Sequence, residues 1–120
     1  MYALNFYSPL FIEQLRKGRK TATIRLGDKR RKYERGQLVW VTVGHRHGPR
    51  QRLFTAIIDE VTVKRVGNLT QREIERDNPE FRLVEDIVQF LSHIYSRDIT
   101  EDDEVTVVHF SEVIEFPPLD

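Results

Sequence analysis

The sequence contains no cysteine, and its apolar residues never form a long run. The lack of cysteine excludes a disulfide framework and a thiolate metal site, and it fits a reducing compartment. No apolar stretch approaches the roughly 18–20 residues that span a bilayer. The first residues also lack the basic segment and apolar core of a signal peptide. The sequence therefore predicts a cytoplasmic protein without a membrane segment.

The chain also has no net charge, since its 19 basic residues are balanced by 19 acidic residues. The charges are segregated, however. Residues 1–52 hold 13 basic and 3 acidic residues, a formal +10, and the rest hold 6 and 16, a formal −10. Such segregation indicates an anionic partner such as nucleic acid. The alternatives are that the two halves interleave and neutralise each other, or that the acidic half serves a protein-interaction module.

The length and apolar content predict one domain over residues 1–120. Apolar residues make up 39% of the 120 positions, enough to bury a core without disulfides or metal. No repeat, low-complexity tract or linker interrupts the chain.

Hydrophobic periodicity and turn signals predict an α+β fold. Ser8 and Pro9 are typical of a helix start, Gly18 of a helix end, and Thr70 with Glu73 of a capping box. We expect helices near 9–17, 71–77 and 82–95, and strands at 2–6, 21–26, 38–43, 53–63, 105–110 and 113–116. Because the helices fall at crossings between strands, the pattern favours a mostly antiparallel sheet that closes into a small barrel.

The most distinctive segment is Gly18-Arg19-Lys20-Thr21-Ala22-Thr23-Ile24-Arg25. Thr23 and Arg25 share one face of the predicted strand, and the long stem of Lys20 can reach the same side. A hydroxyl beside cationic groups suits a phosphate, a base edge or a developing oxyanion. The structural alternative is an ordinary strand, because Thr is a good strand former and surface Arg and Lys are common.

The next charged segment holds Lys29, Arg30, Arg31 and Lys32, followed by Tyr33. Basic side chains next to an aromatic ring are typical of a phosphate-contacting loop. An ordinary solvated loop is the alternative.

Histidines offer a weaker signal. His45 and His47 could bind a metal with His93 or His109. Their Gly-rich hairpin has no nearby carboxylate, which favours an exposed turn, and we expect no metal and no cofactor. Trp40 lies inside the strand-forming run 38–43, so we expect it in the core.

The segment that begins at Gly18 resembles the signature of ASCH domains, G-x-K-x-x-E-x-R. Gly18, Lys20 and Arg25 match it, and Thr23 stands where many ASCH domains carry Glu. With Thr at this position, the sequence resembles the small ASCH amidohydrolases that remove the acetyl group from N(4)-acetylcytidine. The resemblance extends over residues 3–116. It implies a PUA-like β-barrel of mostly antiparallel strands with two or three flanking helices.

The resemblance also implies a catalytic Lys–Thr–Glu set. Lys20 and Thr23 are its first two members, and Asp77, one methylene shorter than Glu, takes the third place. Glu73 and Glu75 are near enough to substitute. In this scheme a Lys20 of lowered pKa activates the Thr23 hydroxyl, and the acid passes a proton to the leaving amine.

Two functional hypotheses follow. The first is a protein that binds RNA or a modified nucleoside in a basic cleft containing Lys20, Thr23 and Arg25, with further contacts from Arg19 and residues 29–32. The alternative is an amidohydrolase that deacetylates N(4)-acetylcytidine in the same cleft. A lowered Lys20 pKa beside a carboxylate favours the enzyme, and a wide basic face favours the RNA-binding protein.

Overall fold

The computed structural model describes residues 1–45 and 47–114. Its elements follow the chain in the order β1 (Ala3–Phe6), α1 (Phe11–Arg16), β2 (Ala22–Leu26), β3 (Leu38–Gly44), β4 (Arg50–Arg65), a 3₁₀ turn (Val66–Asn68), α2 (Gln71–Asp77), α3 (Val84–Tyr95) and β5 (Glu104–Glu112). None of the helices in these residues combines the length and the apolarity needed to cross a membrane.

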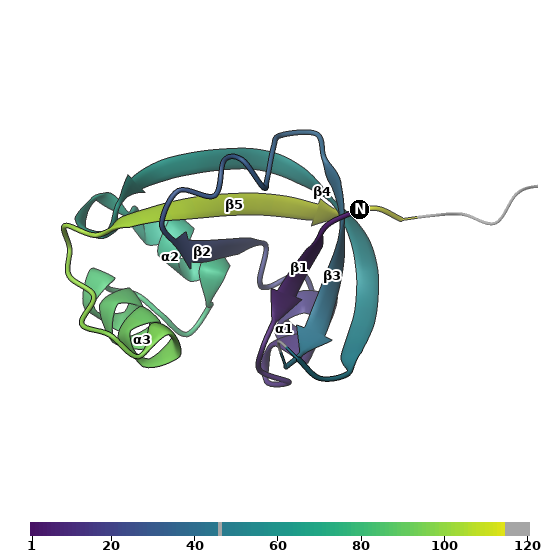
Figure 1. Ribbon diagram of the computed structural model, residues 1–120, viewed down its shortest axis with the longest axis horizontal. Coiled ribbons are helices and arrows are strands. Elements are labelled where there is room, and N and C mark those ends of the chain that lie inside the picture. Colours follow the sequence, from purple (N-terminus) through teal and green to yellow (C-terminus); the bar gives the residue numbers. More distant parts are fainter. Residues whose placement is uncertain (46, 115–120) are drawn as a thin grey trace, which may run out of the picture.

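The five described strands form one mixed sheet in the order β1-β3-β4-β5-β2. β1 pairs with β3 in parallel, and the other three pairs are antiparallel. Figure 1 shows the sheet curving strongly, with α1 beside β1 and β3, and with α2 and α3 near the N-terminal end of β5. The α+β class and the mostly antiparallel sheet are confirmed. The sheet forms a half-barrel, because its edge strands β1 and β2 do not pair with each other.

Two apolar cores lie on opposite faces of β5. Val108 and Phe110 pack in one core with β1, β3 and α1. Val105 and Val107 pack in the other, beneath α2 and α3. Alternate residues of a strand point to opposite faces, so β5 joins the half-barrel to the helical layer.

The predicted helix signals near 18 and 70 are confirmed. Gly18 follows the C-cap of α1 with φ +69°, a left-handed conformation that glycine adopts without a Cβ clash. At α2, the Thr70 hydroxyl accepts from the Glu73 amide, and the Glu73 carboxylate accepts from the Thr70 amide. α2 then ends at Asp77, with Asn78 as its C-cap.

The predicted start of α1 at residue 9 was wrong. The Ser8 hydroxyl accepts a hydrogen bond from the Leu10 amide, and the Ser8 carbonyl accepts from the Phe11 amide. These bonds form a turn, and the helix begins only at Phe11.

The predicted break in the last strand was also wrong. β5 runs unbroken to Glu112, and its neighbours Val113 and Ile114 are not in a strand. The remainder of the predicted strand 113–116 lies outside the described residues, as does Arg46.

Trp40 is not in the core. Val39 and Val41 point inward and are fully buried, so the alternation of β3 turns Trp40 outward, where it is 38% exposed. The Arg52 guanidinium carbon lies 4.6 Å from the centre of the indole ring and covers part of it.

Candidate functional site

The loop between α1 and β2 directs Lys20 into the protein. The amides of Arg19 and Lys20 both donate to the Gln14 carbonyl, at 2.9 and 3.1 Å, and wrap the chain over the end of α1. The Lys20 side chain is only 3% exposed, whereas Arg19 stays exposed.

The buried Lys20 ammonium uses all three of its protons. It donates to the Ala22 carbonyl at 3.0 Å, to the Asp77 carbonyl at 2.5 Å and to Asp77 Oδ1 at 3.2 Å. It also lies 5.0 and 5.1 Å from the ring centres of Phe6 and Phe11. Burial lowers the pKa of Lys20 below its ordinary value, and the Asp77 carboxylate opposes that shift.

Asp77 ties α2 to β2. Its Oδ1 accepts from the Ile24 amide at 3.0 Å as well as from Lys20, and the side chain is nearly fully buried. The alternative acids have other partners: Glu73 binds Lys64 at 2.8 Å, and Glu75 accepts from Gln71 at 3.0 Å. Of the three acids considered from sequence, Asp77 is the one that the structure brings to Lys20.

Thr23 and Arg25 form a second pair, and as alternate residues of β2 they share one face of that strand. Arg25 Nε donates to Thr23 Oγ1 at 2.9 Å, and Arg25 Nη2 donates to the Asn5 carbonyl of β1 at 3.1 Å. The guanidinium carbon also lies 5.2 Å from the centre of the Phe6 ring. Arg25 therefore links the two edge strands of the half-barrel through its side chain.

The two pairs share a neighbour but do not bond to each other. Phe6 contacts both Lys20 and Arg25. Within the described part of the chain, no hydrogen bond joins the Lys20 ammonium to the Thr23 hydroxyl. The Thr23 oxygen accepts from Arg25, so its own proton remains available to a base.

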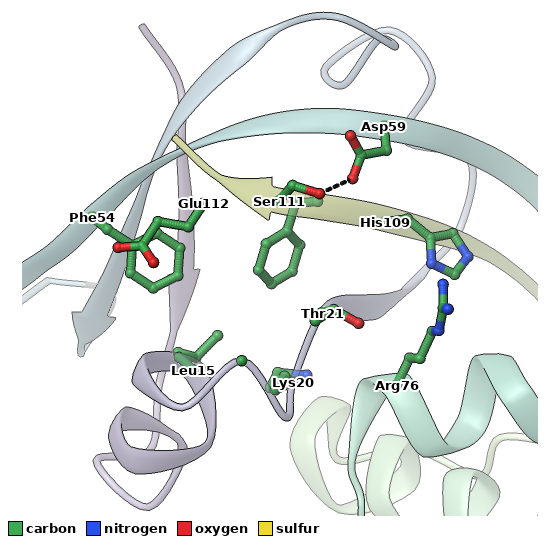
Figure 2. Close-up of a pocket in the computed structure, with 11 residues that line it drawn as sticks. Leu15, Lys20, Thr21, Phe54, Asp59, Arg76, His109, Ser111 and Glu112 are labelled. Carbon is green, nitrogen blue, oxygen red and sulfur yellow. Dashed lines mark hydrogen bonds between the residues drawn. The ribbon is translucent and has the colours of Figure 1, made fainter. Parts of the chain in front are cut away.

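A cleft of about 360 Å³ opens beside Lys20 (Figure 2), and Thr23, Arg25 and Asp77, which the sequence predicted in the same cleft, are not among the residues that line it. Gly18, Lys20 and Thr21 of the predicted motif form one wall, and Arg76 of α2 comes from another side. β5 contributes four residues to the cleft: His109, Phe110, Ser111 and Glu112. The lining is completed by Leu15, Phe54 and Asp59. Figure 2 shows Ser111 Oγ donating to Asp59 Oδ2, at 2.5 Å.

Sequence reasoning identified only part of this cleft. His109 was considered solely as a metal ligand, and Arg76 and Ser111 were not considered at all. Strand alternation could have placed His109 and Ser111 on one face. No local pattern shows that Arg76 faces β5, because this depends on how α2 packs.

The remaining predicted nucleic-acid residues lie on the surface. Lys29, Arg30, Arg31 and Lys32 are all exposed. Arg30 already pairs with Asp28 at 2.6 Å, and hydrogen bonds from Arg30 lower the pKa of Asp28 to about 2. Lys32 lies 5.7 and 5.3 Å from the ring centres of Tyr2 and Tyr33.

The comparisons identify the fold. An ASCH domain from Lactobacillus crispatus superposes with a TM-score of 0.65 at 15% identity, over 90% of this chain and 77% of that one. The chain has the ASCH-type fold. A protein of Enterococcus faecalis assigned to the DUF984 family gives 0.69 at 16% identity, over 94% and 80% of the two chains. A third structure, described as a hypothetical protein, gives 0.66 at 18% identity, over 91% and 95%.

No family model and no curated protein matches the sequence itself. The predicted PUA-like ASCH architecture is thus confirmed as a fold, in its half-barrel form.

Within the ASCH-type fold, the basic and acidic halves of the chain are interleaved, but few ion pairs between described residues connect them. β2 from the basic half lies beside β5 from the acidic half. Yet among ion pairs between described residues, only Lys20–Asp77 joins the two halves.

The histidines do not assemble a metal site in the part of the chain that the structure describes. No group of three or more His, Asp or Glu side chains there is arranged to hold a metal ion. His45 and His47 are exposed on the β3–β4 loop.

Proposed function

We propose that this ASCH-type protein binds RNA or a modified nucleoside in the cleft beside Lys20. The observation that supports the proposal is the position of the cleft: Gly18, Lys20 and Thr21 of the ASCH-like motif form its wall. Its volume of about 360 Å³ falls at the lower end of small-molecule sites, a size that suits one nucleoside.

The lining offers what a nucleoside needs. The apolar side chains of Leu15, Phe54 and Phe110 can contact the face of a base. The carboxylates of Asp59 and Glu112 can accept from amino groups and from ribose hydroxyls. A nucleoside in this cleft is therefore held by one apolar surface and a few polar groups.

The exposed basic residues extend the proposal from a nucleoside to an RNA strand. Arg19 stands at the same loop as Lys20, and Arg31 and Lys32 project from the β2–β3 loop. Because few of these charges are paired internally, they remain available to phosphates. Cytoplasmic location stays a prediction, in keeping with such a partner.

A binding experiment tests the proposal. Calorimetry with cytidine and N(4)-acetylcytidine, and fluorescence anisotropy with a short single-stranded RNA, should show binding. Ser111→Trp should fill the cleft and weaken nucleoside binding about tenfold or more. Gln51→Trp, an exposed site on β4 outside the cleft lining, is the matched control. Absence of both nucleoside and RNA binding at low salt would overturn the proposal.

A second candidate, an amidohydrolase acting on N(4)-acetylcytidine, is favoured by the contact between Lys20 and Asp77. All three Lys20 protons are donated, so Lys20 becomes a base only after one proton moves to Asp77 Oδ1, 3.2 Å away. The neutral amine would then take the Thr23 proton as Oγ1 attacks the acetyl carbonyl.

The remaining steps would use Arg25 and Asp77, which contact Thr23 and Lys20 but do not line the cleft itself. Arg25 would stabilise the oxyanion. The proton on Asp77 would pass to the departing N4 amine, leaving an acetyl ester on Thr23 that water hydrolyses.

Chromatographic release of cytidine tests this candidate. Thr23→Val should abolish turnover, whereas Thr23→Ser should retain part of it, because only the serine restores a hydroxyl. Full turnover by Thr23→Val would exclude Thr23 as the nucleophile. Release of no cytidine by the unmodified protein would leave the binding proposal alone.

A further inference from the structure

Two cationic or potentially cationic side chains, Arg76 and His109, line the same cleft. Figure 2 shows the Arg76 guanidinium extending from α2 toward the His109 imidazole on β5. Within the described residues, the Arg76 side chain has no hydrogen bond and no ion pair. A guanidinium carries five donors, so this arrangement leaves strong donors unused.

His109 is also unsatisfied. Its Nδ1 atom is buried and has no hydrogen-bond partner among the residues that the structure describes. Burial lowers the pKa of His109, and the neighbouring charges of Arg76 and Arg72 lower it further, against Glu60 and Glu73. A buried nitrogen without a partner is rare and calls for an explanation.

The nearby carboxylates do not supply the missing partner. Asp59 accepts from the Ser111 hydroxyl, and Glu60 accepts from the Thr62 hydroxyl at 3.3 Å. Glu73 is engaged by Lys64. An anion from outside the chain, placed between Arg76 and His109, would satisfy both side chains at once.

We infer that Arg76 and His109 form a phosphate subsite, so that the cleft takes a phosphorylated nucleoside. A guanidinium binds two phosphate oxygens in parallel, and an imidazole N–H can bind a third. The phosphate belongs either to a free nucleotide or to the end of an RNA strand. The inference rests on the proposed nucleoside cleft and names the class of ligand that the cleft prefers.

Calorimetry with paired ligands tests the subsite. Cytidine 5′-monophosphate should bind about tenfold or more tightly than cytidine. Arg76→Gln should remove that preference. The matched control is Arg72→Gln, which makes the same charge change one turn away on α2, at an exposed residue outside the cleft lining. It should change the affinity for the nucleotide less than about twofold.

An NMR titration gives a readout that does not depend on nucleoside binding. Inorganic phosphate should raise the pKa of the His109 imidazole in the unmodified protein, because a bound anion favours the imidazolium. The same phosphate should leave that pKa unchanged in Arg76→Gln.

The outcomes separate the subsite from the proposed function. Equal affinity for cytidine and its monophosphate, or equal losses in Arg72→Gln and Arg76→Gln, would overturn the subsite and leave the nucleoside cleft. A phosphate effect on His109 without any nucleoside binding would support the subsite and overturn the nucleoside cleft. Preference for 5′-phosphorylated over unphosphorylated RNA, with no preference among free nucleotides, would assign the phosphate to an RNA end.

Discussion

Lys20 Nζ lies 3.2 Å from Asp77 Oδ1, and neither side chain has more than 6% of its surface exposed. The two residues are 57 positions apart in sequence. Their contact joins the α1–β2 loop to the end of α2, next to the proposed binding cleft. The same pair therefore contributes to the stability of the fold and to the geometry of the site.

Removing one partner of this pair should destabilise the protein strongly. Lys20→Met leaves a buried carboxylate without its cation, which costs about 3–5 kcal/mol. The double variant Lys20→Met/Asp77→Asn should recover part of the loss, because it removes both charges. Urea unfolding measures both effects. Lys17→Met, at the exposed pair with Glu13, is the control, and an equally mild Lys20→Met would show that the buried pair contributes little.

Arg25 should be needed to hold the edge strands together. Arg25→Lys loses the two guanidinium donors that reach Thr23 Oγ1 and the Asn5 carbonyl, at a cost of about 1–3 kcal/mol. Hydrogen exchange should quicken in β1 and β2. Arg31→Lys, at an exposed residue whose side chain makes no hydrogen bond to the described part of the chain, should leave exchange unchanged. Unaltered exchange in Arg25→Lys would show that the half-barrel does not depend on this link.

Glu73 should make stability fall in acid. Burial acts to raise the pKa of Glu73, but bonds from Lys64 and Thr70 outweigh it and hold the pKa below 4.5. The folded state therefore binds the proton less readily than the unfolded state. The stability that Glu73 contributes is fully present above pH 4.5 and is lost as the pH falls through the lowered pKa of the folded state. Urea unfolding at a series of pH values should show that the free energy of unfolding falls less in acid for Glu73→Gln than for the unmodified protein. The same dependence on pH in both proteins would show that Glu73 does not cause the loss of stability.

The two neighbouring arginines of the β2–β3 loop should differ in RNA binding. Arg30 is already paired with Asp28, whereas Arg31 has no ion pair among the described residues. Arg31→Glu should therefore weaken binding more than Arg30→Glu, and nearly equally for different RNA sequences. Anisotropy titrations over a range of salt concentrations measure both. A sequence-dependent loss would indicate a base contact instead of a phosphate contact.

The elements were predictable where local chemistry decides them. The Thr70–Glu73 capping box and Gly18 lie where the sequence predicts, since caps depend on residues a few positions apart. Trp40 was misplaced because an apolar run does not say which of its residues face inward. The open edge between β1 and β2 was missed for a related reason: strand pairing is set by long-range packing.

The candidate site was predictable only along one strand. The Thr23–Arg25 contact follows from strand alternation, and the bond between them fits that expectation. The closeness of Asp77 to Lys20 was predicted only from the resemblance to ASCH domains. The catalytic roles of these residues remain predictions. The closeness of Arg76 to His109 could not be predicted from the sequence, because it depends on how α2 packs against β5.

The central claim is that a nucleoside binds in the cleft beside Lys20, and amide chemical shifts test it most directly. Titration with cytidine should move the amide signals of residues 18–21 and 109–112 together, with one dissociation constant. Signals around the exposed Trp40 should stay in place. Shifts confined to the Trp40 face, or no shifts at saturating cytidine, would contradict the claim.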